Sequence, residues 1–380
     1  MRPWLLVAGD FTPFGGMDAA NHALARYLGA RRDVHLVAHR VAPDVASLPG
    51  VRVHRVRRPL GSHALGGALL SRVGRRVGRS LASKNVLALV NGGNCPIRAP
   101  NWIHYLHAAY EPEPVGSFAR RSKASILRAR DLAAERLALE RAPIVICNSR
   151  RTRDEVVERF GISGSRVHAV YYGTDPLAFS AVAAARRADA KEALGMSRDR
   201  PLVGFVGALG DRRKAFDTVF RAWQRLCRGS SWDADLLVVG SGAEQPAWRQ
   251  RAEETGLMAR IRFVGYRYDV PDILAAVDAL VHPARYEAYG LSVQEALCRG
   301  VPALVSARSG VAERYPSELK DLLILDPNDA GEVAERLTLW RAQIESFPPL
   351  VVPFSNHLRS RTWEAMAAEI ASLVEDAAPA

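Results

Sequence analysis

Residues 285–296 read RYEAYGLSVQEA and carry two glutamates, Glu287 and Glu295, eight positions apart with Gly290 between them. Neighbours on one face of a helix are three or four positions apart, so a salt-bridged helix surface does not account for this spacing. Carboxylates accept hydrogen bonds from hydroxyl groups, and a glycine lets a phosphate approach the backbone closely. The stretch therefore has the residue types that bind a phosphate flanked by two polyols, which is the chemistry of a nucleotide sugar.

Two interpretations of this stretch predict different structures. Ser292 and Glu295 match the capping box S-x-x-E, in which the glutamate satisfies only the first amides of its own helix. Alternatively, the helix opens at Gly290 or Leu291, after a predicted strand at 278–283. That is the edge of a parallel sheet, where α/β proteins bind ligands. The first amides of the helix would then favour an anion, with the two glutamates on either side of it.

Short apolar runs alternate with helical patterns through both halves of the chain, which has 380 residues. Continuous apolar strands separated by helices are typical of parallel sheets covered on both faces. The length is about twice that of a usual single domain. We therefore predict two doubly wound α/β domains, with strands within residues 4–9, 34–39, 85–90, 102–107, 144–149 and 167–172, and then within 202–209, 235–242, 261–265, 278–283, 302–307 and 322–326.

The segment 180–201 is polar, helix-forming and rich in small residues, and it separates the two series of strands. We predict an N-terminal domain over residues 1–182, a linker over 183–200 and a C-terminal domain over 201–356. Residues 357–377 carry apolar side chains at helical spacing and should form a terminal helix that packs on a domain. Its apolar stripe consists of Trp363, Met366, Ile370 and Leu373.

Composition narrows the class of protein. Hydrophobic residues make up 48% and charged residues 24%, as in soluble globular proteins, and the apolar runs are too short to span a membrane. The N-terminal stretch MRPWLLVAGDF has too few apolar residues for a secretory signal. The cysteines show neither a CxxC pair nor metal-ligand spacing, so we expect reduced thiols in a cytoplasmic protein. They are Cys95, Cys147, Cys227 and Cys298.

The net charge of +12 comes from the first half of the chain. Residues 1–190 hold 29 Lys and Arg against 14 Asp and Glu, whereas residues 191–380 hold 23 against 26. A basic half is compatible with nucleic acid, an anionic membrane or an acidic substrate. The sequence has no nucleic-acid recognition motif and no aromatic residues interleaved with its basic clusters, so we expect no nucleic-acid partner.

Part of the basic excess lies in residues 65–81, LGGALLSRVGRRVGRSL. If helical, this segment is either a basic amphipathic surface for anionic membrane headgroups or a core-facing stripe with a solvated arginine face. Its four glycines weaken a free-standing helix, which favours the second interpretation. The stripe is Leu65, Leu69, Val73, Val77 and Leu81, and the arginines around it are Arg72, Arg75, Arg76 and Arg79.

The order of motifs resembles the retaining glycosyltransferases of the GT-B fold, family 4, also called glycosyltransferase group 1. Their signature E-x7-E is here Glu287 to Glu295. Residues 9–28 look like the family's glycine-rich loop, 106–109 like its interdomain histidine segment and 205–217 like its basic phosphate loop. The resemblance extends over almost the whole chain, since the segments 238–242, 262–266 and 302–313 complete the usual series.

The resemblance implies two Rossmann-like domains that face each other across a cleft, with the C-terminal helix packing back toward the N-terminal domain. It implies catalytic roles for Glu287, at the donor sugar, and for His107, at the cleft. Arg213 and Lys214 would hold the donor diphosphate, and Glu295 would bind the ribose. The other donor-binding residues that it implies are Gly16, Tyr266, Ala288, Tyr289, Gly290 and Leu291.

Some of these assignments have alternatives in the sequence itself. The basic run at 211–214 is also typical of a solvated charge cluster, and His104 is a second candidate for the cleft histidine. Many relatives carry an arginine directly after the glycine of the first C-terminal strand, where this chain has Ala208. One customary phosphate contact is therefore absent, and we expect Arg212 or Arg213 to replace it.

The resemblance implies a retaining hexosyltransferase that moves a sugar from a UDP- or GDP-sugar to a lipid-linked, polysaccharide or other acceptor hydroxyl, without a metal or other cofactor. A glycosidase is a weaker interpretation. Its two carboxyls would have to flank one glycosidic bond at roughly 5–9.5 Å, whereas a helix start between the two glutamates would spread them along a nucleotide sugar. The alternative from another class is a peripheral membrane or scaffolding protein that keeps the fold with impaired catalysis. We expect the protein in the cytoplasm, peripheral at the inner face of the membrane.

Overall fold

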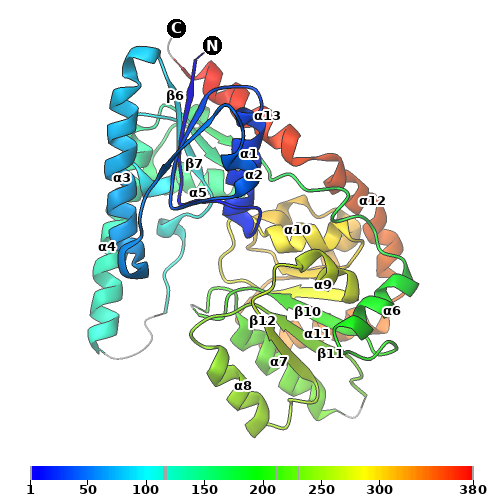
Figure 1. Ribbon diagram of the computed structural model, residues 1–380. Helices are drawn as coiled ribbons and strands as arrows, with labels where there is room; N and C mark the ends of the chain where they lie inside the picture. Colours follow the sequence, from blue (N-terminus) through cyan, green and yellow to red (C-terminus); the bar gives the residue numbers. More distant parts are fainter. Residues whose placement is uncertain (1, 114–117, 211, 230, 379–380) are drawn as a thin grey trace. The chain divides into compact units, whose positions relative to one another are not determined.

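The structure is a computed structural model that describes residues 2–113, 118–210, 212–229 and 231–378. It contains two compact units, one formed by residues 1–173 and 361–380 and the other by residues 174–360 (Figure 1). Each unit has its own parallel sheet, as the pattern of apolar runs predicts. All twelve predicted runs overlap a strand of the structure.

The first unit is built on a seven-stranded parallel sheet. Its central strands β1 and β3 are fully buried, which explains why their sequences are nearly continuous apolar runs. The strand order is β5 (Val51–Arg55), β3 (Val34–Ala38), β1 (Trp4–Val7), β6 (Leu87–Asn91), β7 (Asn101–Ile103), β8 (Val145–Cys147) and β9 (Val167–Ala169). The unit also contains the short pair β2 (Asp10–Phe11) and β4 (Arg40–Val41), and helices α1 (Gly16–Gly29), α2 (Pro43–Ala46), α3 (His63–Ser80), α4 (Phe118–Arg141), α5 (Arg150–Phe160) and α13 (Trp363–Asp376).

Strand β5 corresponds to none of the predicted apolar runs. This strand lies at the edge of the sheet and pairs with β3. Its residues are partly buried or exposed, and both Arg52 and Arg55 face solvent. An edge strand does not need the continuous apolar run of a central strand, so a search for such runs passes over it.

The second unit has a six-stranded parallel sheet of the same kind. Its order is β12 (Ile261–Gly265), β11 (Asp235–Val239), β10 (Leu202–Val206), β13 (Ala279–His282), β14 (Ala303–Ser306) and β15 (Leu323–Ile324). The helices are α6 (Ala184–Ala193), α7 (Phe216–Arg228), α8 (Gln245–Glu254), α9 (Val270–Ala276), α10 (Leu291–Cys298), α11 (Ala330–Ala342) and α12 (Phe347–Ser360). Because β10 and β13 are neighbours, the loops that follow them begin at adjacent points of the same sheet edge.

The boundary between the units lies earlier than the predicted linker, between residues 173 and 174. Most of the segment 183–200 is helix α6, which packs on α9 within the second unit. Lys191 anchors this helix, because its buried ammonium group lies 2.7 Å from Asp278 Oδ2. The polar composition of this segment therefore belongs to a surface helix of the second unit.

The predicted terminal helix over 357–377 is interrupted. Helix α12 ends at Ser360, and α13 begins at Trp363 after Thr362, whose hydroxyl accepts a hydrogen bond of 3.1 Å from the backbone N–H of Ala365. A threonine in this position is a typical helix N-cap. Helix α13 packs on α1 and buries Met366 and Ile370 of the predicted stripe, so the C-terminal helix joins the N-terminal unit as expected.

Helix α3 contains residues 65–80 of the basic segment, with Leu81 at its C-cap, and packs its apolar side against the sheet of the first unit. Of the predicted stripe, Val77 and Leu81 are buried, Leu69 and Val73 pack against the same core, and only Leu65 is exposed. The helix lies close to the sheet, since a Cβ on its buried Gly74 would meet the side chain of Val7, on β1, at 3.2 Å. The core-facing interpretation is thus confirmed for this stripe, and the four arginines are exposed.

Among the helices that the structure describes, none is long and apolar enough to cross a membrane.

We predict that Leu70→Ala, on the buried side of α3, lowers the free energy of unfolding by about 2–5 kcal/mol, because it removes core volume without a replacement. Leu65→Ala is the matched control on the same helix, since Leu65 is 49% exposed, and it should change stability by no more than about 0.5 kcal/mol. Denaturant unfolding of both variants measures the difference. Equal losses would contradict the packing of this face.

Candidate functional site

The predicted helix opening lies at the carboxyl end of a central strand. The chain leaves β13 at His282, turns through residues 283–290 and enters α10 at Leu291. Gly290 precedes the helix with φ 108°, a conformation that other residues rarely adopt, and a Cβ there would meet Val311 at 3.1 Å. The capping-box interpretation is wrong, because the residue at the N-cap is Gly290 rather than Ser292, and Glu295 is the fifth residue of the helix.

Backbone hydrogen bonds hold the turn before α10 in place. The N–H of Gly310 donates to the carbonyl of Glu287 at 3.0 Å, and the N–H of Val311 donates to the carbonyl of Tyr289 at 2.7 Å. The side chains of Ala288 and Tyr289 are buried. These two residues can therefore offer a ligand little more than backbone groups.

The carboxylate of Glu287 lies in a cluster of three basic side chains. Its Oε2 atom pairs with Lys214 Nζ, is 3.7 Å from an Arg213 guanidinium nitrogen and is 3.3 Å from His282 Nε2. The side chain of His282 is fully buried, and those of the other three residues are less than a fifth exposed. The structure thus brings Arg213 and Lys214 together with Glu287, which lies 73 positions after Lys214 in the sequence.

This cluster controls the charge of Glu287. Burial by itself would raise the pKa of the carboxyl group, but Lys214, the hydrogen bond with His282 and Arg213 together hold that pKa well below its usual range. Burial, with Lys214 nearby, lowers the pKa of His282 in turn. Glu287 is therefore ionised at neutral pH, and its negative charge is shared among neighbouring donors.

The basic loop between β10 and α7 has a constrained backbone. Arg212 and Ala215 have φ values of 54° and 55°, in the left-handed region that costs a residue with a Cβ roughly 1–2 kcal/mol. Arg213 and Lys214 between them have side chains that are only 18% and 14% exposed. The solvated-cluster interpretation is therefore wrong for these two residues. Arg212 is 40% exposed and reaches Glu244 at 3.4 Å.

Glu295 has a different environment from Glu287. It is partly buried on α10, and no hydrogen-bond donor contacts its carboxyl group among the described residues. Burial raises the pKa of this carboxyl group to about 8. A carboxyl that is largely protonated at neutral pH can both donate and accept hydrogen bonds, as a sugar hydroxyl requires.

Tyr266 follows β12 and is 56% exposed. Its ring meets that of Tyr268 edge-on, with the ring centroids 5.0 Å apart and an interplanar angle of 80°. Tyr268, which is not among the predicted site residues, is also exposed, at 65%. The two rings together offer an aromatic surface after this strand.

In the first unit, Gly16 begins helix α1 and follows Gly15, which has φ 82°. His107 begins a short helical turn, and its backbone N–H and its Nδ1 atom lie 2.9 and 3.0 Å from Glu135 Oε1. The N–H of Ala108 donates to Oε2 of the same carboxylate at 3.1 Å. Glu135, a buried residue of α4 that the sequence gives no signal for, thus fixes the histidine segment.

The structure separates the two candidate histidines. His104 is 9% exposed, its Nδ1 atom lies 2.5 Å from the hydroxyl of Tyr172, and burial lowers its pKa to about 3. His107 has a side chain that is 43% exposed and oriented by Glu135. His104 is therefore a neutral core residue, whereas His107 has the exposure that contact with a substrate needs.

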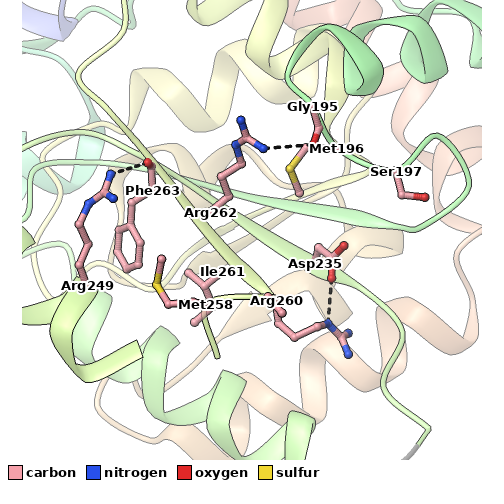
Figure 2. Close-up of a pocket in the computed structure, with 11 residues that line it drawn as sticks. Gly195, Met196, Ser197, Asp235, Arg249, Met258, Arg260, Ile261, Arg262 and Phe263 are labelled. Carbon is pink, nitrogen blue, oxygen red and sulfur yellow. Dashed lines mark hydrogen bonds and ion pairs between the residues drawn. The ribbon is translucent and has the colours of Figure 1, made fainter. Parts of the chain in front are cut away.

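A pocket of about 400 Å³ lies elsewhere in the second unit, at the amino ends of β11 and β12 (Figure 2). Its three arginines are bonded within the protein: Arg260 to Asp235, Arg249 to the carbonyl of Phe263 and Arg262 to the carbonyl of Gly195. None of the predicted site residues lines this pocket. Among the described residues, no three His, Cys, Asp or Glu side chains gather into a possible metal site.

Two units with parallel sheets, the second with a basic loop and a glycine-initiated helix at one sheet edge, define the GT-B architecture. Solved structures share this fold over nearly the whole chain. Sucrose-phosphate synthase from Thermosynechococcus elongatus has a TM-score of 0.79 at 22% identity and 99% coverage of both chains. Anabaena HepE, in complex with UDP and glucose, has a TM-score of 0.74 at 19% identity, covering 99% of this chain and 100% of that one.

Family models match both units. Residues 14–176 match "Glycosyltransferase Family 4", and residues 186–346 match "Glycosyl transferases group 1". The chain belongs to this family of glycosyltransferases.

Among curated relatives, the 2-deoxystreptamine N-acetyl-D-glucosaminyltransferase of Streptomyces fradiae is 32% identical over 197 residues, which are 50% of this chain and 46% of the relative. The alpha-D-kanosaminyltransferase of Streptomyces kanamyceticus is 28% identical over 47% of this chain and 46% of its own. The match thus spans about half the length of these relatives.

The raised pKa of Glu295 predicts a pH dependence of stability. Between pH 4.5, the usual pKa, and about 8, the folded protein keeps a proton on Glu295 that the unfolded chain releases. This group therefore makes the free energy of unfolding fall as the pH rises through that window. We expect Glu295→Gln to reduce the fall, measured by denaturant unfolding at several pH values. Glu253→Gln, at an exposed position of α8, is the control, and an identical pH profile for both variants would contradict the assignment.

Proposed function

We propose that the protein is a retaining glycosyltransferase that transfers a sugar from a UDP- or GDP-sugar to an acceptor hydroxyl. The observation that carries this proposal is the cluster of Arg213, Lys214 and Glu287 at the carboxyl edge of the second sheet, next to the start of α10. Cations beside a helix N-terminus favour a diphosphate, and a carboxylate in the same place can bond sugar hydroxyls. The relatives whose names specify a sugar transfer support the same class of reaction.

The donor would lie along this edge of the sheet. Arg213 and Lys214 hold the diphosphate, each through charge-assisted hydrogen bonds of about 1.5–3 kcal/mol. Glu287 bonds the transferred sugar, and Glu295 bonds the ribose. The backbone of residues 288–291 meets the phosphates, and Tyr266 lies by the base. His107 contacts the sugar or acceptor, with Glu135 as its orienting partner.

The leaving group would be stabilised by fixed cations, without a metal or other cofactor. Double displacement would need Glu287 as a nucleophile beneath the sugar. The carboxylate is a poor nucleophile, because Lys214 and His282 already hold its Oε2 atom and its pKa is far below its usual range. Front-face substitution, in which the departing phosphate helps to deprotonate the acceptor, accounts for retention without such a step.

The test measures release of nucleoside diphosphate from a panel of UDP- and GDP-sugars, with and without acceptors. The acceptors include 2-deoxystreptamine, which the name of the Streptomyces fradiae relative specifies. We expect release with at least one donor and a loss of more than tenfold in kcat for Glu287→Gln, since one charge-assisted contact is worth at least that factor. Glu253→Gln is again the control. No release with any donor would favour the alternative, a scaffolding or peripheral membrane protein with impaired catalysis. The observation behind that alternative is Ala208, which stands where many relatives carry an arginine.

A finer part of the proposal concerns the acceptor, which we propose to be lipid-linked or a polysaccharide, reached at the inner face of the membrane. The support is the arginine face of α3, formed by Arg72, Arg75, Arg76 and Arg79, all of which are exposed. Arginines near an anionic surface contribute about 1 kcal/mol each, and salt screens the attraction. The apolar side of α3 is used in the core, so this attachment would be electrostatic.

We predict that the protein co-sediments with anionic vesicles at low salt, less so at high salt, and not with neutral vesicles. Changing the four arginines of this face to Gln should abolish the binding. A matched control changes four exposed arginines of the second unit, Arg186, Arg225, Arg228 and Arg251. Equal binding to both kinds of vesicle, or the same loss in the control, would remove the membrane from the proposal and leave the sugar transfer unaffected.

A further inference from the structure

Arg285 lies two positions before Glu287 and is almost completely bonded within the second unit. Its two terminal nitrogens donate to the two carboxylate oxygens of Asp217 at 2.8 and 2.7 Å, a bidentate pair. The first of these nitrogens also donates to the carbonyl of Arg212 at 2.5 Å, and Nε donates to Asn328 Oδ1 at 2.6 Å. The side chain is 12% exposed. One guanidinium therefore joins three separate segments of the chain.

These contacts surround the basic loop. Asp217 is in the first turn of α7, directly after the loop. The carbonyl of Arg212 is at the beginning of the loop. The backbone N–H of Arg285 donates to the carbonyl of Arg213 at 2.8 Å, and the Arg213 guanidinium donates back to the carbonyl of Tyr286 at 3.2 Å. The segments 212–217 and 285–287 are thus bonded to each other along their length.

The basic loop needs such support. Arg212 and Ala215 lie on either side of the cations Arg213 and Lys214. Both have left-handed φ values, although neither is a glycine. Backbone in this region persists only where surrounding contacts determine it. Arg285 bonds the carbonyl of the first of these residues and the helix that follows the second.

We propose that Arg285 and Asp217 form a clamp that positions Arg213 and Lys214 for a nucleoside diphosphate, without contacting that ligand. This inference deepens the proposed function and rests on it. If Arg213 and Lys214 are already held in place, binding does not have to order them first. The clamp should therefore raise the affinity for a diphosphate more than the affinity for a monophosphate. Arg285 is accordingly a positioning residue and not a catalytic one.

The chemistry requires an arginine at this position. A guanidinium is planar and donates through several N–H groups at once, whereas a lysine ammonium cannot bond both oxygens of a carboxylate and a carbonyl in the same geometry. Arg285→Lys keeps the positive charge and removes the fork. Asp217→Asn keeps the side-chain shape and removes the charge from the other partner.

A matched control exists at the opposite edge of the same sheet. Arg260 donates to Asp235 at 2.8 Å (Figure 2). It also donates to the carbonyls of Trp232 and Ala234 at 3.0 and 2.6 Å. It therefore makes the same kinds of bond as Arg285, with a side chain 23% exposed, but at the amino ends of the strands. Arg260→Lys therefore removes a guanidinium that bonds a carboxylate and two carbonyls, away from the basic loop.

The experiment is calorimetric titration of UDP, UMP, GDP and GMP into the full chain, with a thermal unfolding curve for each variant. In Arg285→Lys and Asp217→Asn, we expect the ratio of diphosphate to monophosphate affinity to fall by on the order of tenfold, the value of one charge-assisted hydrogen bond. Lys214→Ala, which removes a direct contact, should lower the ratio at least as much. Arg260→Lys should leave the ratio at its original value even if the protein unfolds at a lower temperature.

The outcomes separate the clamp from the proposed function. An unchanged ratio in both Arg285→Lys and Asp217→Asn, with the original protein preferring the diphosphate, overturns the clamp and leaves the proposed function standing. An equal fall in Arg260→Lys also overturns it, because the effect would then be a general loss of stability. If the original protein shows no preference for a diphosphate over a monophosphate, both inferences fail. Should Arg285→Lys not fold, Asp217→Asn alone decides.

Discussion

The negative charge of Glu287 lies inside the second unit and has to be balanced there. Leaving a buried carboxylate without its partner costs about 3–5 kcal/mol, which is a large part of the stability of a domain. The balancing cations, Arg213 and Lys214, come from the loop after β10, and the carboxylate comes from the loop after β13. These two strands are neighbours in the sheet, as their parallel pairing shows, so their loops begin side by side and the charges can meet. The ion cluster thus depends on the order of the strands.

The two glutamates of the motif have opposite electrostatic environments although they belong to one short segment. Glu287 is surrounded by donors and stays ionised, whereas burial alone raises the pKa of Glu295 to about 8. Pairs of carboxyl groups whose pKa values are pushed apart are typical of sites that assign different roles to them. Beside the diphosphate that we propose for this edge of the sheet, a protonated Glu295 would add hydrogen-bonding capacity without adding repulsion. A single sequence pattern therefore contains one charged and one largely neutral group.

Much of the fold follows from the sequence because buried parallel strands leave a clear apolar signature. The strands β10, β11, β13 and β14 are nearly or fully buried, and all were predicted. The edge strand β5 was missed because its charged residues face water. The position of α6 within the second unit also escaped prediction, since a polar surface helix and a polar linker have similar compositions.

The candidate site was predictable to the level of motifs but not of partners. The helix opening at Gly290 follows from glycine chemistry, and the basic loop follows from its family resemblance. His282, Glu135 and Arg285 were not singled out, because each acts through a contact with a residue distant in sequence. A histidine at a strand end, or an arginine before a motif, has no local pattern that distinguishes an orienting partner from an ordinary core or surface residue.

The close approach of α3 to its sheet has an evolutionary consequence. Gly74 and the apolar stripe fix this helix from its inner side, while Arg72, Arg75, Arg76 and Arg79 point away from the core. Substitutions among the four arginines change the charge of the surface without changing the volume of the core. The binding partners of this basic face can therefore change during evolution without a loss of folding stability. Arg213 and Lys214 of the second unit have no such latitude, because each of them also balances the carboxylate of Glu287.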